Sequence, residues 1–192
     1  MNLPNRLTIL RTILIIPFVI IMLTQCLGDW SNWVALALFC IASLTDLLDG
    51  KIARKYNLIT NFGKFMDPLA DKLLVCSALI CLMELSLMPA WAVILIMGRE
   101  FIISGFRLVA SDNGVVIAAS MWGKSKTVSQ MIMTIMLLTD LPGLVNLVIK
   151  LDWLPEVYGI LCQISIWVAV ILTIISLIDY VIKNKDVMKD TK

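Results

Sequence analysis

Histidine is absent from the 192 residues of the chain, which removes the side chain used most often as a general base and as a ligand for transition metals. Cysteine is scarce as well. The five cysteines form no Cys-x-x-Cys pair and lie in or beside apolar runs, so they predict small buried side chains rather than a metal site or disulfides. Only 16% of the residues are charged. Catalysis would therefore depend on carboxylates, lysines, hydroxyls or a metal ion held by oxygen.

Hydrophobic residues, in contrast, make up 60% of the chain, and the mean hydropathy is +0.93, whereas a soluble domain is about 45–50% apolar. They form runs long enough for a helix to cross the hydrocarbon core of a bilayer. We therefore predict an all-α, polytopic membrane protein, with a single membrane domain over residues 1–192 and about six transmembrane helices. A short N-terminal amphipathic segment is expected at residues 2–7, and the helices are expected at residues 8–27, 32–54, 62–86, 89–110, 125–148 and 157–182.

Lysine and arginine are distributed unevenly among the connections between these helices. They precede the first helix, surround the second connection, flank the fourth and fill the C-terminal tail, whereas only Lys150 falls on the other side. Because such residues favour the cytoplasmic side of a membrane, both termini are predicted to be cytoplasmic. Tryptophans cluster near the opposite helix ends, as in an interfacial belt. The sequence thus predicts a multi-pass protein of the cell membrane.

Four aspartates lie at the cytoplasmic ends of the second and third predicted helices. Asp46 and Asp49 are three residues apart, and Asp67 and Asp71 are four residues apart, so each pair shares a helical face. A short hairpin brings all four to a similar membrane depth, where ionisable groups are costly and usually functional. Their oxygens would suit Mg²⁺, Mn²⁺ or Ca²⁺, and two such ions can clamp a diphosphate.

The alternative is that these aspartates only cap helices and pair with neighbouring cations. Lys51, Arg54, Lys55 and Lys64 are close enough in sequence to serve as partners. Four clustered carboxylates repel one another unless a positive charge lies between them, which favours the metal site. The small side chains at positions 50 and 53 also leave room for a nucleotide or a neighbouring backbone.

The stretch that carries the four aspartates resembles the signature of the CDP-alcohol phosphatidyltransferases. The pattern D-x-x-D-G-x-x-A-R, eight residues, G-x-x-x-D-x-x-x-D is matched without departure. The matching residues are Asp46, Asp49, Gly50, Ala53, Arg54, Gly63, Asp67 and Asp71. The resemblance implies a six-helix, usually dimeric membrane enzyme with a two-metal site for Mg²⁺ or Mn²⁺ and CDP-diacylglycerol as the usual donor. It implies that Asp46, Asp49 and Asp67 ligate metal, and that Asp71 is the general base and a fourth metal ligand.

Three weaker stretches resemble the branch of the family that uses sn-glycerol 3-phosphate as acceptor. They begin at residues 2, 98 and 123. Basic side chains that could hold the acceptor phosphate are Arg107, Lys124 and Lys126. Residues expected to contact the CDP and diphosphate part of the donor are Asn5, Thr8, Asp46, Gly50, Ala53, Arg54 and Gly63.

Other interpretations of these residues stay open. Lys124 and Lys126 would also be expected from the charge bias of cytoplasmic connections alone, and Arg99 and Glu100 are expected to neutralise each other inside the bundle. A different acceptor, such as inositol phosphate, serine or phosphatidylglycerol, would use the same aspartates. A cation transporter is a further alternative, but it predicts charges near the bilayer midplane and often inverted repeats, and no repeat is visible. Membrane lipids and a second copy of the chain are the expected partners, without nucleic acid.

Overall fold

The structure is a computed structural model that describes all residues except 1–2, 56–60, 113–119, 140–144, 146–150 and 185–192. The described residues form six α-helices and one short 3-10 helix, and they contain no strand. The elements are α1 (Leu3–Thr24), η1 (Gly28–Trp30), α2 (Ser31–Lys55), α3 (Asn61–Glu84), α4 (Ala90–Asp112), α5 (Met121–Leu138) and α7 (Leu154–Lys183). The prediction of an all-α fold is confirmed.

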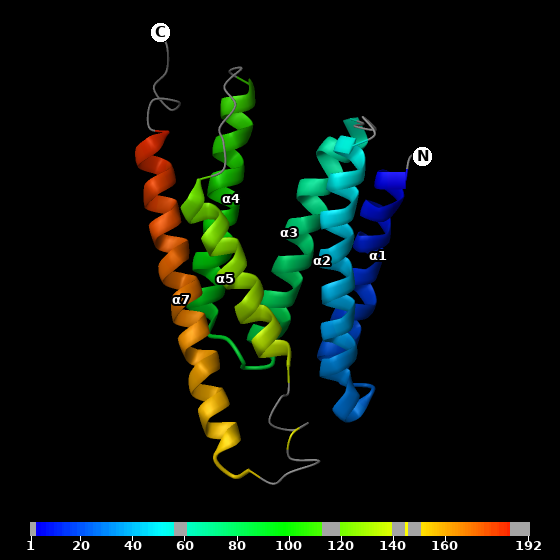
Figure 1. Cartoon of the computed structure of the whole chain (residues 1–192), viewed down its shortest axis with the longest axis vertical. Helices are drawn as coiled ribbons and strands as arrows, with labels where there is room; N and C mark the ends of the chain where they lie inside the picture. Colours follow the sequence, from blue (N-terminus) through cyan, green and yellow to red (C-terminus); the bar gives the residue numbers. More distant parts are fainter. Residues whose placement is uncertain (1–2, 56–60, 113–119, 140–144, 146–150, 185–192) are drawn as a thin grey trace. The chain divides into compact units, whose positions relative to one another are not determined.

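One compact unit comprises residues 1–87 and 138–140 and contains α1, α2 and α3. Helix α1 packs along both α2 and α3 (Figure 1). The rings of Phe18 on α1 and Phe39 on α2 are buried with their centroids 6.1 Å apart. Alanines at positions 35, 42 and 78 are also buried, and such small side chains let helix backbones approach closely.

The predicted aspartate site lies at the end of this unit where α2 stops and α3 starts. Because α2 ends at Lys55 and α3 begins at Asn61, the two helices run in opposite directions and their joined ends lie together, next to the start of α1 (Figure 1). The N-terminal turns of α1 therefore lie beside the aspartate-bearing segments. Residues 3–7 are continuous with the rest of α1, so the predicted amphipathic segment forms the first turns of a long helix.

The second compact unit comprises residues 88–137 and 141–192 and contains α4, α5 and α7. Helix α4 packs along α7 (Figure 1), with Ile96 and Ile166 among the buried side chains. The Tyr158 hydroxyl of α7 donates a hydrogen bond of 2.7 Å to the carbonyl of Met136 on α5. This contact ties the last turn of α5 to the first turns of α7.

Large apolar side chains are exposed along the long helices, as a lipid environment allows. Ile16 on α1, Ile94 on α4 and Ile182 on α7 are each more than 60% exposed. Two of the described helices, over Asn5–Thr24 and Leu154–Lys183, are long and apolar enough to cross a membrane by length and composition. These features agree with a membrane protein, and the count of six spans stays a prediction.

Candidate active site

Asp67 on α3 is held by a hydroxyl from another helix. Thr8 on α1 is fully buried, and its Oγ1 donates a hydrogen bond of 2.6 Å to Oδ1 of Asp67. Asp67 is half-buried, whereas Asp71, one turn further along α3, is exposed. A carboxylate offers about four acceptor positions, so the bond from Thr8 fixes the orientation of Asp67 and leaves its other positions for a ligand.

Two more of the predicted donor-binding residues lie in the same unit. Asn5 is 7% exposed and comes one turn before Thr8 on α1. Gly63 is buried and comes one turn before Asp67 on α3. The first turns of α1 and α3 thus both place predicted donor-binding residues at the end of the unit where the predicted carboxylate site lies.

The other half of the predicted site is on α2, which carries Asp46 and Asp49 in its C-terminal half. The side chains of Asp46, Asp49, Gly50, Ala53 and Arg54 lie outside the described residues. Among the side chains that are described, no group of three or more His, Cys, Asp or Glu residues is close enough to hold a metal ion.

The described donor set still suits a hard divalent cation. Asp67 and Asp71 supply carboxylate oxygens one turn apart on one helix, and the backbone of α2 carries two more aspartates at the same end of the unit. Mg²⁺ and Mn²⁺ prefer such oxygen ligands. The hydroxyl of Thr8 orients the carboxylate of Asp67, as outer-shell partners of metal ligands commonly do.

The second unit contains a buried cluster of charged and polar side chains. Glu100 on α4 accepts hydrogen bonds through Oε1 from Lys126 Nζ at 2.5 Å and from Arg99 Nη1 at 3.1 Å. Lys126 also donates to Gln130 one turn along α5, and Arg99 Nη2 donates to Ser176 Oγ of α7 at 2.5 Å. The predicted pairing of Arg99 with Glu100 is confirmed, and the cluster joins α4, α5 and α7.

The three basic residues predicted to bind the acceptor phosphate have different surroundings. Arg107 on α4 and Lys124 on α5 are exposed, whereas Lys126 is 1% exposed and bonded to Glu100 and Gln130. Phosphate binding by Lys126 stays a prediction, and it would require the ammonium group to exchange one of these partners for the phosphate. Arg107 and Lys124 could receive an anion without breaking a described bond.

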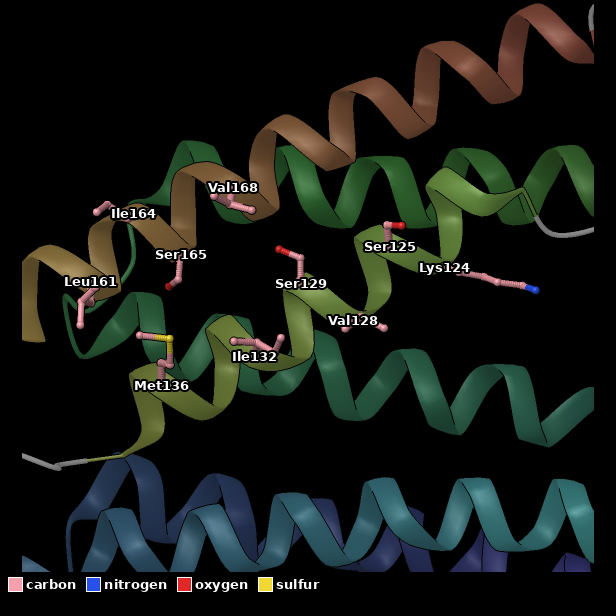
Figure 2. A pocket seen from close by; sticks show the side chains of 10 residues that line it. All are labelled: Lys124, Ser125, Val128, Ser129, Ile132, Met136, Leu161, Ile164, Ser165 and Val168. Carbon is pink, nitrogen blue, oxygen red and sulfur yellow. The ribbon is translucent and has the colours of Figure 1, made fainter.

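A groove of about 610 Å³ lies between α5 and α7 in the second unit. Its lining is mostly apolar, with side chains such as Ile132, Met136 and Ile164, and Figure 2 shows Ser129 and Ser165 pointing toward the space between the two helices. Lys124 lies at one end of the groove. An aliphatic chain with an anionic group at that end would match this distribution of apolar and charged surface.

Loss of the Lys126 ammonium should destabilise the second unit, because Glu100 is only 24% exposed and would lose the nearer of its two cations. We expect Lys126→Met to cost about 1–3 kcal/mol, the range for removing one partner of a buried polar group. The measurement is the midpoint temperature of thermal unfolding of the purified protein in detergent. Lys124→Met, at an exposed position on the same helix, should change this midpoint little. Adding Glu100→Gln to Lys126→Met should recover part of the loss, and an unchanged midpoint for Lys126→Met alone would contradict this role.

The sequence predicts the aspartates as site residues, but it does not predict the partners of several predicted site residues. The bond between Thr8 and Asp67 joins residues 59 positions apart, and no local pattern predicts such a pair. Tyr180 was missed as well, although its ring lies 6.0 Å from the Arg107 guanidinium carbon. An aromatic residue in an apolar run looks like a packing residue, so its position beside a predicted phosphate ligand emerges only from the fold.

Comparison with known proteins agrees with the family resemblance of the sequence. The family model for CDP-alcohol phosphatidyltransferase matches residues 1–175. A Bacillus subtilis protein named CDP-diacylglycerol–glycerol-3-phosphate 3-phosphatidyltransferase is 47% identical, over 98% of this chain and 97% of the relative. Proteins of the same name from Rickettsia typhi and Escherichia coli are 41% and 35% identical, over 91% and 93% of this chain and 92% of each relative.

Proposed function

Because the chain belongs to the CDP-alcohol phosphatidyltransferase family, we propose that it transfers the phosphatidyl group of CDP-diacylglycerol to sn-glycerol 3-phosphate. The products are phosphatidylglycerol phosphate and CMP, a step of phospholipid biosynthesis. The proposal is supported by relatives that carry this name and align with this chain over nearly its whole length. It is also supported by the arrangement of α1 and α3, which brings Thr8 to Asp67, one turn before the exposed Asp71.

Residues of α1, α2 and α3 are the proposed ligands of the donor and the metal ions. Enzymes of this family generally depend on a divalent metal, and Asp46, Asp49, Asp67 and Asp71 would hold two Mg²⁺ or Mn²⁺ ions here. Bound metal would offset the negative charge of the diphosphate as it breaks. Thr8 holds Asp67 in one orientation, and Asn5 at the start of α1 contacts the CDP part. Gly50, Ala53 and Gly63 are proposed as further contacts of the donor, since small residues let a ligand approach closely.

Asp71 is the proposed general base. Its carboxylate is exposed, so an incoming hydroxyl can reach it. It accepts the proton from the primary hydroxyl of sn-glycerol 3-phosphate while that oxygen forms a bond to the lipid-side phosphorus. The bond from phosphorus to the leaving oxygen breaks, and CMP departs. Because a carboxylate is a weak base for an alcohol, the proton moves late, as the new P–O bond forms.

Arg107, Lys124 and Lys126 are the proposed ligands of the acceptor phosphate. Arg107 and Lys124 are exposed and free of described ion pairs, and a guanidinium can bind a phosphate through two parallel hydrogen bonds. Lys126 is proposed as a further phosphate ligand that keeps its contacts with Glu100 and Gln130 until the acceptor enters. Both termini and the active site are proposed to face the cytoplasm, as the lysine and arginine distribution predicts. A homodimer is the proposed assembly.

The acceptor is tested by CMP release from CDP-diacylglycerol and Mg²⁺ by the purified protein. Release is compared with sn-glycerol 3-phosphate, glycerol, serine, inositol, inositol phosphate and phosphatidylglycerol. We expect release only with sn-glycerol 3-phosphate. Release with another alcohol alone would keep the chemistry of the aspartates and overturn the acceptor. If no alcohol supports release, ion flux in proteoliposomes would test the transporter alternative.

A further inference from the structure

Tyr180 is a buried aromatic residue placed beside a charged side chain near the ends of two helices. It is 3% exposed on α7, and its ring lies 6.0 Å from the guanidinium carbon of Arg107 on α4. Tyr180 lies three residues before the end of α7, and Arg107 lies five residues before the end of α4. The two helices pack along each other within the second unit (Figure 1), so this contact belongs to a packed part of the fold.

The ring of Tyr180 is itself held in place. Phe106, the neighbour of Arg107 on α4, meets it edge to face with the centroids 6.0 Å apart and the planes at 89°. This is one of the preferred geometries of aromatic pairs. Because Tyr180 is buried and Phe106 packs against its ring, the aromatic face under Arg107 is a rigid surface.

The contact with the ring orients a guanidinium that is otherwise little constrained. Arg107 is exposed and makes no ion pair among the described residues. The neighbouring carboxylate, Asp179, is instead paired with Lys183 at 2.6 Å. A cation over an aromatic face is attracted by the quadrupole of the ring. The ring therefore limits the conformations of Arg107 while its N–H donors stay available to an anion.

The hydroxyl of Tyr180 has no part in this arrangement. It is buried and has no hydrogen-bond partner among the described residues. A buried polar group without a partner is destabilising, and its hydrogen bonding does not hold Arg107. The ring alone accounts for the contact, so phenylalanine should replace tyrosine without loss of the orienting effect.

From these contacts we infer that Tyr180 is a positioning residue for the acceptor: its ring holds the Arg107 guanidinium in the orientation that binds the phosphate of sn-glycerol 3-phosphate. The inference rests on the proposed function, and it adds a residue that acts through Arg107 without touching the substrate. Preorganising a charged side chain lowers the cost of immobilising it when the ligand binds. The effect should therefore appear in the affinity for the acceptor and not in the affinity for the donor.

The test measures KM and kcat for both substrates in a set of variants. Tyr180→Leu should raise the KM for sn-glycerol 3-phosphate about three- to tenfold, as expected for loss of a cation–π contact. The KM for CDP-diacylglycerol and kcat should stay within about twofold of the wild-type values, because this contact does not involve the donor. Tyr180→Phe, which keeps the ring, should restore the acceptor KM. Trp167→Leu is the matched control, because it removes an α7 ring from an aromatic pair with Trp91, at 5.2 Å, that lies beside no described cation.

A double-mutant cycle with Arg107→Ala separates this inference from the proposed function. Arg107→Ala alone should raise the acceptor KM, and Tyr180→Leu should add no further increase in that background. If Arg107→Ala raises the acceptor KM but Tyr180→Leu does not, the inference about Tyr180 is wrong and the proposed function stands. An equal rise of both KM values in Tyr180→Leu, or a similar rise in Trp167→Leu, would assign Tyr180 a purely structural role. If the wild-type protein does not use sn-glycerol 3-phosphate, the proposed function fails first.

Discussion

Replacing Asp71 by asparagine is expected to lower kcat for CMP release by about 10²–10⁴-fold, the usual contribution of a positioned general base. The amide has nearly the same shape as the carboxylate but cannot accept the proton of the acceptor hydroxyl. Because Asp71 is exposed, the fold should be unaffected. The measurement is CMP release at saturating CDP-diacylglycerol and sn-glycerol 3-phosphate, with thermal stability measured in parallel.

Two controls accompany this prediction. Glu84→Gln removes an exposed carboxylate at the far end of the same helix and should leave kcat within about twofold, as surface changes away from a site usually do. A Mg²⁺ titration of Asp71→Asn separates a base from a metal ligand, since excess metal compensates for weaker binding and cannot replace a base. Near-normal turnover in Asp71→Asn would refute the base assignment. Full recovery at high Mg²⁺ would leave Asp71 as a metal ligand only, without the role of general base.

Replacing Thr8 by valine should raise the Mg²⁺ concentration needed for half-maximal activity by about 10–100-fold, the range reported for loss of an outer-shell partner of a metal ligand. Valine fills the same volume but leaves Oδ1 of Asp67 without the hydrogen bond of 2.6 Å that orients it. Direct Mn²⁺ binding, followed by calorimetry or by electron paramagnetic resonance, should weaken in parallel.

Matched variants separate the hydrogen bond from the packing at this position. Thr8→Ser keeps a donor at Oγ and should stay within about threefold of wild type if the bond to Asp67 is what matters. Thr12→Val removes a hydroxyl one turn along α1 that donates only to the carbonyl of Thr8 among the described contacts, and it should leave the Mg²⁺ requirement unchanged. An unchanged metal requirement in Thr8→Val, or an equal change in Thr12→Val, would contradict the proposed role of Thr8.

Those parts of the fold that depend on local sequence could be predicted well. Apolar runs and breakers place α1, α2, α3, α4 and α7 close to their expected ranges, since helix length in a membrane follows from bilayer thickness. The boundaries were less predictable. The first helix already includes residues 3–7, and α3 is continuous through Pro68 although proline removes a backbone donor.

In the candidate site too, local features could be predicted from the sequence, whereas tertiary contacts could not. The spacing of the aspartates predicts a shared helical face, because residues three and four apart are neighbours on any helix. The tertiary contacts were not predictable, since Thr8 meets Asp67 and Arg99 meets Ser176 across long separations in sequence. Lys126 is buried, whereas Lys124, two residues earlier, is exposed, and the sequence does not distinguish the two lysines. Only the ion pair between α5 and α4 shows that Lys126 is the lysine that faces Glu100.

The most direct test of the proposed transfer reaction is to identify both products and measure their ratio. Purified protein is given CDP-diacylglycerol, Mg²⁺ and radiolabelled sn-glycerol 3-phosphate, and both CMP and lipid-extractable label are measured. We expect one equivalent of label in phosphatidylglycerol phosphate for each CMP released, with both products lost when EDTA removes the metal. CMP release that leaves the label in the aqueous phase, or transfer that continues in EDTA, would contradict the proposed reaction.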